Sequence, residues 1–381
     1  MVWVLRLLFW RSWFFNTVKL LPLFLLLIFA KTLHSQQLGH GYEFENNGKR
    51  DRNEKFEQIY TKVEIDAPGI GIDFILKKAL KQNEKFLKRK ASEHSIGNLD
   101  FSNSELLGVS QKLHESLDSI DLSSFEFHQI NGEDEKGNVH FTGYFVPVIE
   151  VHQQADSVFK YPLYERPSIP YSQMPSRKEI DFDKALKGQN LELAYTSSLL
   201  DNFFMQVQGS GIIRYQDGKT KLLSYGGNNG KKYTSIGKYL VSSGQIEESE
   251  ISLKSIREYF EKNPDSLETV LSKNESYTFF VKTGEKPVGA ANIALTPEVS
   301  IAVDPNFIPL SSILLAKVPT LNEAGELVGH EFQIVIAQDK GGAIRGSGHV
   351  DVYFGIGNDA KKKASALHHY GVLWLLLPKE N

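Results

Sequence analysis

The chain has 381 residues, of which 41% are hydrophobic and 23% charged, a globular composition that excludes fibrous structure and disorder throughout. Its 43 Lys and Arg residues against 46 Asp and Glu residues give a formal net charge of −3, which argues against a protein built mainly to bind nucleic acid. The chain contains no cysteine, so a disulfide framework, a Cys-ligated zinc, a thiol nucleophile and a lipid-modified N-terminal cysteine are excluded.

The N-terminal region has the pattern of an export signal. Basic residues precede an apolar run from Leu20 to Ala30, and no acidic residue occurs before Glu43. The run is too short to span a bilayer comfortably, but further apolar residues lie upstream, so an uncleaved signal-anchor is an alternative. We predict a signal peptide or signal-anchor at 1–35 and a flexible polar leader at 36–58, and we expect the protein to be exported.

Periodicity predicts helices at 72–90 and 102–117, where apolar residues recur at three- and four-residue spacing. The first helix also carries a basic face, which could touch an anionic polymer or simply face solvent. Downstream the pattern changes to short segments of alternating polarity separated by Gly and Pro, and many short strands at this spacing are typical of a small closed barrel. The strands are expected at 139–148, 203–207, 211–215, 222–225, 277–281, 300–303, 313–318, 332–337, 349–353 and 372–377, and further helices at 251–262 and 267–271.

Two acidic residues near the C-terminus flank a glycine-rich loop. Asp339 and Asp351 each adjoin an apolar strand, and a barrel would bring them near one another at its rim. Two carboxyl groups in a partly apolar cleft can hold different proton affinities, so that one stays protonated and acts as a general acid. Cleavage of a glycosidic bond requires such an acid. The alternative is that both are ordinary turn residues beside glycines.

A second segment, Met205–Gly211, combines Gln and Ser with glycines that would allow a ligand to approach the backbone closely; a β-bulge or tight turn is the alternative. His349 and the pair His368-His369 do not have metal-ligand spacing, and no phosphate-binding loop, dinucleotide fingerprint or zinc-protease motif occurs in the sequence. We therefore expect neither a metal nor a cofactor.

Taken in chain order, a series of motifs resembles the membrane-bound lytic murein transglycosylase A family from about residue 120 to the C-terminus. The motifs are Phe141-Thr142-Gly143-Tyr144-Phe145, Tyr161-Pro162-Leu163-Tyr164, Leu199–Gly211, Tyr225–Gly237, Asn274–Phe280, Val303–Pro309, Asp339–Gly346, Asp351–Gly357 and Tyr370–Trp374.

This resemblance implies a mainly β fold with a few helices. It implies a discontinuous double-psi β-barrel, the catalytic domain, formed by 59–141 and 274–381, and an inserted β domain at 142–273 that binds substrate. A groove between the two domains would hold a peptidoglycan glycan strand. We expect a monomer that binds no nucleic acid and has other cell-wall enzymes as possible partners, located in the periplasm or at the outer membrane but not as a lipoprotein.

The implied reaction is cleavage of the β-1,4 bond between N-acetylmuramic acid and N-acetylglucosamine without water, leaving a 1,6-anhydro ring on muramic acid. Asp351 matches the family's catalytic aspartate, which would act first as general acid and then as base. Asp339 would support it, and Thr142 would donate a hydrogen bond near the scissile oxygen or Asp351. The resemblance further implies that the sugar subsites are lined by Gln208, Gly209, Ser210, Tyr225, Gly226, Asn229 and Arg345.

Some features depart from the family pattern. Members are often lipoproteins, which the absence of cysteine excludes here, and Val350 stands where Phe often precedes the catalytic aspartate. Two other functions also fit the residues. An inverting glycoside hydrolase would use Asp339 as the base that activates water, and a non-catalytic, expansin-like protein would bind glycan without cutting it.

Overall fold

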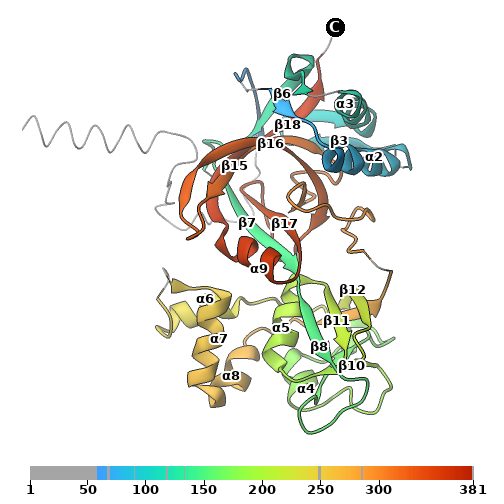
Figure 1. Cartoon of the computed structure of the whole chain (residues 1–381), viewed down its shortest axis with the longest axis vertical. Helices are drawn as coiled ribbons and strands as arrows, with labels where there is room; N and C mark the ends of the chain where they lie inside the picture. Colours follow the sequence, from blue (N-terminus) through green and yellow to red (C-terminus); the bar gives the residue numbers. More distant parts are fainter. Residues whose placement is uncertain are drawn as a thin grey trace, which may run out of the picture.

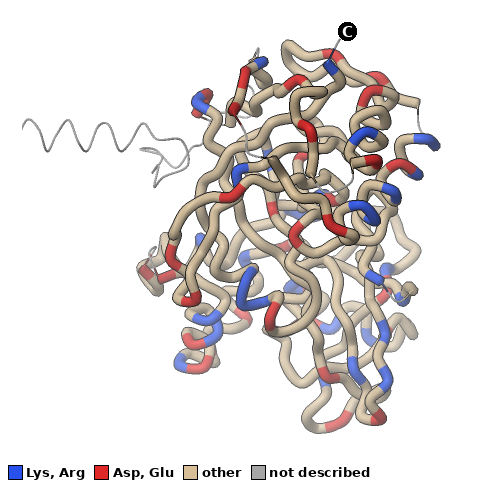
Figure 2. Tube along the Cα trace, turned by 45° about the horizontal axis from the view of Figure 1, so that its top comes forward, with Lys and Arg blue, Asp and Glu red and all other residues tan. Residues whose placement is uncertain are grey.

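The computed structural model describes residues 58–66, 69–89, 91–116, 119–132, 134–247, 250–284 and 286–379. The predicted signal, and all of the predicted leader except its last residue, lie outside the described residues. A barrel fills the upper part of Figure 1, and a second sheet with several helices fills the lower part. Acidic and basic residues are interspersed over both parts (Figure 2).

Six strands of the described chain close into the barrel, in the order β7, β18, β15, β16, β14, β17 and back to β7. The pairs β7–β17 and β14–β16 are parallel and the others are antiparallel. Because β7 lies before the long stretch that builds the lower half and the other strands lie after it, the predicted mainly β fold with a discontinuous barrel is confirmed. The strands are β7 (Val139–Val146), β14 (Ser300–Val303), β15 (Ile313–Leu321), β16 (Leu327–Lys340), β17 (His349–Ile356) and β18 (His368–Pro378).

Alternate residues of these strands fill the barrel interior, including Phe141, Val303, Leu314, Val335, Val350 and Leu375. The residues between them face outward. On the β15, β16 and β18 side, outward residues such as Leu315, Ile334 and Trp374 pack against helices α2 (Phe74–Arg89) and α3 (Asn103–Glu115). Both helices were predicted, and α3 begins with a capping box between Ser102 and Glu105.

Smaller elements complete the upper half. Strand β6 (Phe125–Ile130) pairs with the C-terminal half of β18, and β1 (Tyr60–Val63) pairs with β6. Helix α9 (Gly357–Ala366) lies against β7 and β17. Two short antiparallel pairs join β2 (Ile70–Gly71) with β5 (Ser119–Ile120), and β3 (Glu93–Ile96) with β4 (Leu99–Ser102), which are neighbours in sequence.

The lower half contains a sheet in the order β13, β12, β11, β8, a pair of strands β9 and β10, and a set of helices (Figure 1). Its strands are β8 (Val148–Val151), β9 (Tyr161–Tyr164), β10 (Glu192–Thr196), β11 (Gly211–Tyr215), β12 (Thr220–Asn228) and β13 (Thr278–Lys282). Its helices are α4 (Arg177–Asp181), α5 (Leu199–Gln208), α6 (Ile236–Ser242), α7 (Leu253–Lys262) and α8 (Leu267–Leu271).

The strand predicted at 203–207 is wrong, because this segment belongs to helix α5. The Ser198 side chain accepts a hydrogen bond from the Asp201 amide and so caps the helix, and Gly209, at φ 78°, ends it. Between these ends Leu199, Leu200 and Phe203 recur at helical spacing and pack against the helices α6 and α7. The apolar run is compatible with a strand or a helix, and the cap at Ser198 stabilises the helix.

The two halves share a continuous chain and an apolar contact. Strand β7 leads through Pro147 directly into β8, as Figure 1 shows. On the outer face of the barrel, Tyr144 and Tyr353 pack against Leu222 of the second sheet. The barrel strand β7 extends to Val146, past the boundary expected at 142, and the domain boundaries themselves stay predictions.

The close approach of α9 to β7 depends on Gly143. A Cβ at this position would lie 2.6 Å from the Ala364 Cα and 2.7 Å from the Phe354 ring. We expect Gly143→Ala to lower the free energy of unfolding by about 1–3 kcal/mol, since the helix must shift. Gly342→Ala is the matched control, because no atom lies within 4 Å of a Cβ there. Urea unfolding of both variants measures the effect; equal stabilities would contradict it.

Candidate active site

The predicted catalytic residues lie in one row across the barrel wall. Asp351 of β17 pairs with Thr142 of β7 on one side and with Ala302 of β14 on the other, and Ala302 also pairs with Asp339 of β16. Directly paired residues point to the same face of a sheet. Because the adjacent Val350 points into the barrel, this row lies on the outer face. The two carboxyl groups thus belong to the outer face of the barrel wall, with Asp339 next to the end of β16.

Asp351 is held by a short hydrogen-bond chain. Thr142 Oγ1 donates to Asp351 Oδ1 at 2.9 Å, and His349 Nε2 lies 2.8 Å from the same hydroxyl oxygen. A hydroxyl has one proton, so when Thr142 donates to Asp351 it must accept from His349, which then carries its proton on Nε2. In this arrangement His349 orients the Thr142 hydroxyl toward Asp351.

The surroundings of Asp351 favour its protonated form. Burial raises the pKa of Asp351 to about 7, the charge of Asp339 adds to this, and the hydrogen bond from Thr142 opposes it. The residue nevertheless remains partly exposed. A carboxyl group that is protonated near neutral pH and reachable from solvent can give a proton to a bound substrate.

Asp339 is engaged on both of its oxygens. Oδ2 accepts a hydrogen bond from the Tyr144 hydroxyl at 2.9 Å, and Oδ1 accepts from the backbone amides of Ala290 and Lys340, each at 2.9 Å. Burial raises the pKa of Asp339, and these hydrogen bonds oppose the rise. The sequence alone predicted no role for Tyr144. Its position two residues after Thr142 in the same strand places both side chains on the outer face of the barrel.

Histidines continue the outer face beyond Thr142. His140 Nε2 lies 2.9 Å from His368 Nδ1, and the rings of His140 and His349 stack with centroids 5.2 Å apart. Burial, reinforced by neighbouring imidazoles and Lys238, lowers the pKa of His140 to about 3 and that of His349 to about 4. Both are therefore neutral at pH 7. Within the described ranges, no cluster of three or more His, Asp or Glu residues could hold a metal ion.

The residues predicted in the Gln208–Ser210 segment join the two halves. Gln208 ends helix α5, and its Oε1 accepts a hydrogen bond from the Phe145 amide of β7 at 3.0 Å. Gly209 adopts the left-handed conformation that terminates the helix, and Ser210 is half-buried. The segment thus lies next to the barrel strand that carries Thr142.

Of the remaining predicted binding residues, Tyr225 and Gly226 lie in strand β12 and Arg345 lies in a loop. Tyr225 is 54% exposed near the end of β12, and Gly226 lies so close to β13 that a Cβ would be 2.7 Å from the Phe280 carbonyl carbon. Arg345 is exposed in the loop between β16 and β17, where its Nη1 donates to the Ile344 carbonyl at 2.8 Å.

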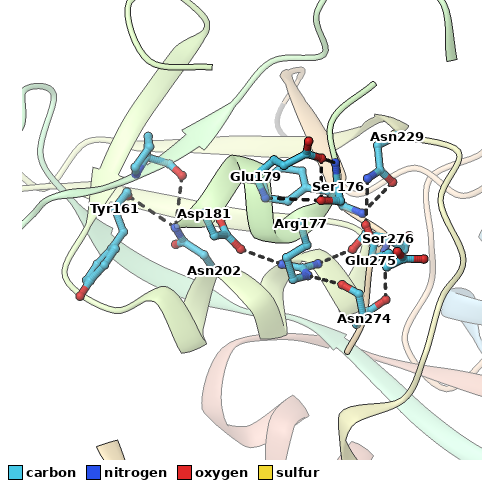
Figure 3. A network of polar contacts seen from close by, with 12 residues as sticks. Tyr161, Ser176, Arg177, Glu179, Asp181, Asn202, Asn229, Asn274, Glu275 and Ser276 are labelled. Carbon is cyan, nitrogen blue, oxygen red and sulfur yellow. Dashed lines mark hydrogen bonds and ion pairs between the residues drawn. The ribbon is translucent and has the colours of Figure 1, made fainter. Parts of the chain in front are cut away.

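Asn229 cannot contact a sugar directly, because its side chain is fully buried. Its Nδ2 donates to the carbonyls of Pro175 and Glu275, each at 2.9 Å, and its Oδ1 accepts from the Tyr277 amide at 2.9 Å. Figure 3 shows this side chain within a polar network. The expectation of direct binding is corrected: Asn229 holds the loop after β12 in place.

Arg177 anchors the same network from helix α4. It is buried, forms an ion pair with Asp181 at 3.2 Å, and donates to the carbonyls of Asn274 and Ser276 at 3.0 and 2.6 Å (Figure 3). Removing a buried partner of this kind leaves several polar groups unsatisfied. The network therefore fixes the segment 274–276, which precedes β13. Through Asn229 it also fixes the loop after β12.

Two regions of the chain match known domain families. Residues 140–281 match the family described as the MltA specific insert domain, and residues 299–377 match the 3D domain.

Named relatives cover much of the chain. It is 42% identical over 252 residues to the membrane-bound lytic murein transglycosylase A of Vibrio cholerae serotype O1, which covers 65% of this chain and 68% of the relative. It is 32% identical over 370 residues to the membrane-bound lytic murein transglycosylase A homolog of Buchnera aphidicola subsp. Schizaphis graminum, over 95% of this chain and 96% of the relative.

Solved structures share the fold. Escherichia coli MltA with bound chitohexaose aligns with a TM-score of 0.71 and 31% identity, over 87% of this chain and 98% of that chain. A membrane-bound lytic murein transglycosylase from Agrobacterium tumefaciens aligns with a TM-score of 0.68 and 26% identity, over 79% of this chain and 92% of that chain.

The raised pKa of Asp351 gives a prediction for stability. Its ordinary value is 3.8, so the folded protein holds this proton more tightly than the unfolded chain and loses stability as the pH rises through about 7. Asp351→Asn removes this loss. At about 1.4 kcal/mol per pKa unit, the advantage of the variant in free energy of unfolding should grow by up to about 3 kcal/mol from pH 5 to pH 8.

Urea unfolding at both pH values measures this growth. Asp183→Asn, at an exposed aspartate, serves as the control and should show no such growth. An advantage of Asp351→Asn that is the same at pH 5 and pH 8 would show that the carboxyl group is not held in its neutral form.

Proposed function

The chain belongs to the membrane-bound lytic murein transglycosylase A family, and on this premise we propose that it cleaves the β-1,4 bond between N-acetylmuramic acid and N-acetylglucosamine in peptidoglycan without consuming water. The observation that carries the proposal is the Asp351 carboxyl group, which has a pKa raised by burial to about 7, accepts a hydrogen bond from Thr142 and belongs to a partly exposed residue.

A single carboxyl group can perform both halves of this reaction. Asp351 donates its proton to the glycosidic oxygen as the bond from C1 of muramic acid breaks, and the leaving N-acetylglucosamine keeps that proton on its hydroxyl. The C6 hydroxyl of the same muramic acid then bonds to C1 and gives its proton to the Asp351 carboxylate. The product has a 1,6-anhydro ring, Asp351 is protonated again, and the nucleophile is already within the bound substrate.

The neighbours of Asp351 suit this cycle. Thr142 stabilises the carboxylate that forms after the first proton transfer, since a hydrogen bond to the charged form favours that form. Asp339 disfavours the same charge, so the proton returns readily in the second step. The two influences oppose each other and keep the proton affinity of Asp351 in the range where it can both give and accept.

The contacts of Asp339 favour this route over an inverting hydrolase. A base that activates water needs a free acceptor position, and three of the roughly four positions of the Asp339 carboxylate already accept hydrogen bonds, from Tyr144 and from two backbone amides. We therefore assign Asp339 to a supporting role, in which its charge and its fixed position act on Asp351.

We propose that the glycan strand lies along the outer barrel face between the two halves. Gln208, Gly209 and Ser210 adjoin β7 there, and we place Tyr225, Gly226 and Arg345 at further sugar contacts. A relative has been solved with bound chitohexaose, which is consistent with a glycan ligand for this fold. Asn229 supports these contacts from within the loop.

The relatives are named membrane-bound, and we propose that this protein is exported and associated with the cell envelope. Among the residues that the structure describes, no helix is long and apolar enough to cross a membrane. The predicted signal or signal-anchor at 1–35 stays a prediction, as do the monomeric state and any cell-wall partner enzymes.

The main test is the product of digestion. Purified peptidoglycan sacculi treated with the protein should release fragments one water lighter than hydrolysis products, measured by mass spectrometry. Asp351→Asn should lower turnover by about 10²–10⁴-fold, the usual contribution of a positioned acid–base group, whereas Asp339→Asn should lower it less. Release of hydrolysed ends would indicate the hydrolase, and absence of bond cleavage by the wild-type protein would indicate a protein that only binds glycan. Full turnover by Asp351→Asn would show that Asp351 is not the acid.

Thr142 gives a second test, on the pH profile. Its hydrogen bond lowers the pKa of Asp351, so Thr142→Val should raise that pKa and move the alkaline limb of the kcat/KM profile to higher pH. Thr142→Ser keeps the hydroxyl and should retain the wild-type profile. If the Val variant shows the wild-type profile, the hydroxyl does not act on the proton of Asp351.

A further inference from the structure

Arg166 follows strand β9 in the sequence and lies on the glycine-rich end of β12. The carbon at the centre of its guanidinium is 4.7 Å from the centroid of the Tyr171 ring, and its Nε donates to the Asn228 carbonyl at the limit of hydrogen-bond distance, 3.5 Å. The positive charge of Arg166 also lowers the pKa of Tyr225, against the larger effect of burial, which places it near that ring. Arg166 therefore packs on Tyr171 and lies close enough to Tyr225 for its charge to act on that hydroxyl.

Two glycines make this arrangement possible. A Cβ at Gly227 would lie 2.7 Å from Arg166 Cδ, and a Cβ at Gly230 would lie 2.7 Å from Tyr171 Cδ1. Both glycines have positive φ, 112° and 71°, which other residues rarely adopt. The glycines of this loop thus allow Arg166 and Tyr171 to rest directly on its backbone.

The loop beneath Arg166 is rigid. Asn229, between the two glycines, is buried and bound at both ends of its amide, and Arg177 fixes the segment to which it binds (Figure 3). A guanidinium held on such a support loses little further freedom when it binds a ligand, which increases the affinity that each contact can give.

The charge of Arg166 is uncompensated. Arg177, Arg214 and Arg257 each form an ion pair with an acidic side chain, at 3.2, 3.1 and 2.6 Å. Among the described residues no carboxylate lies within ion-pair distance of Arg166, so its charge is available to a ligand. A planar guanidinium matches a carboxylate with two parallel hydrogen bonds.

The two tyrosines leave open faces beside this charge. Tyr171 is 58% exposed and Tyr225 is 54% exposed, and an aromatic ring of this kind offers an apolar surface to a sugar or an aliphatic chain. Tyr225 is also among the residues that we place at the sugar contacts. The site therefore combines a fixed cation with apolar surface next to the proposed path of the glycan.

We propose that Arg166, flanked by Tyr171 and Tyr225, binds a carboxylate carried by the glycan strand. This inference rests on the proposed function, because it names a substrate group that the same groove would recognise. Two sources of the carboxylate exist on peptidoglycan: the lactyl group of muramic acid when no peptide is attached, and the acidic residues of the stem peptide when one is.

The experiment measures binding by the full chain carrying Asp351→Asn, so that the ligand is not consumed. Three ligands are titrated by calorimetry: glycan strands with stem peptides, strands from which an amidase has removed the peptides, and chitohexaose, which has no carboxylate. We expect Arg166→Met to weaken binding by about tenfold or more for a carboxylate-bearing strand and to leave chitohexaose binding unchanged.

The pattern over the ligands identifies the source. A loss only with peptide-bearing strands assigns the stem carboxylates, and a loss only with peptide-free strands assigns the lactyl carboxylate. Arg214→Met in the same background removes an equal charge from the neighbouring sheet and should change none of the affinities. Arg166→Lys, which keeps the charge without the planar fork, should recover part of the loss.

Two outcomes would overturn the inference: an unchanged affinity of Arg166→Met for both kinds of strand, or an equal loss with chitohexaose, which would indicate a structural role. Failure of the proposed function itself is separate, since it would appear as the absence of anhydro products from the protein with Asp351 intact.

Discussion

The candidate site depends on one parallel pairing, that of β7 with β17. These strands are separated by about two hundred residues, and their register sets Thr142 opposite Asp351. A slip of one residue would turn Asp351 into the barrel interior and bring Val350 to the surface. The packed interior, to which both strands contribute, makes that slip costly, so the same apolar side chains that stabilise the barrel also orient the Asp351 carboxyl group.

Around this carboxyl group the protein balances opposing influences. Burial and a neighbouring acid favour the proton, while a hydroxyl whose own orientation is set by a neutral histidine favours its loss. His140 and His349 carry no charge at neutral pH, because burial, reinforced by neighbouring imidazoles and by Lys238, lowers the pKa of both. An uncharged His349 can orient Thr142 without adding a positive charge that would keep Asp351 ionised.

Sequence reasoning could predict what depends on local pattern. Helices α2 and α3 and most barrel strands follow from periodicity, and the role proposed for Asp351 follows from its motif. It could not predict contacts made between distant segments. Asn229 is buried because its side chain binds backbone groups near residues 175 and 275. Tyr144 reaches Asp339 only after the barrel closes. That Arg166 has no carboxylate partner among the described residues follows only from the three-dimensional structure. The prediction of a strand at 203–207 was wrong because this apolar run suits a helix equally well, and Ser198 caps that helix.

The discontinuous barrel also constrains the order in which the chain can fold. While the polypeptide is being made or translocated, β7 appears long before β17, and its hydrogen-bonding edges have no partner until the C-terminal strands arrive. The lower half, whose strands and helices lie between them in sequence, can collapse in that interval with shorter loops to close. The candidate site is thus completed last, when the final eighty residues join the wall, so a chain truncated before β17 would hold a formed lower half and no pairing of Thr142 with Asp351.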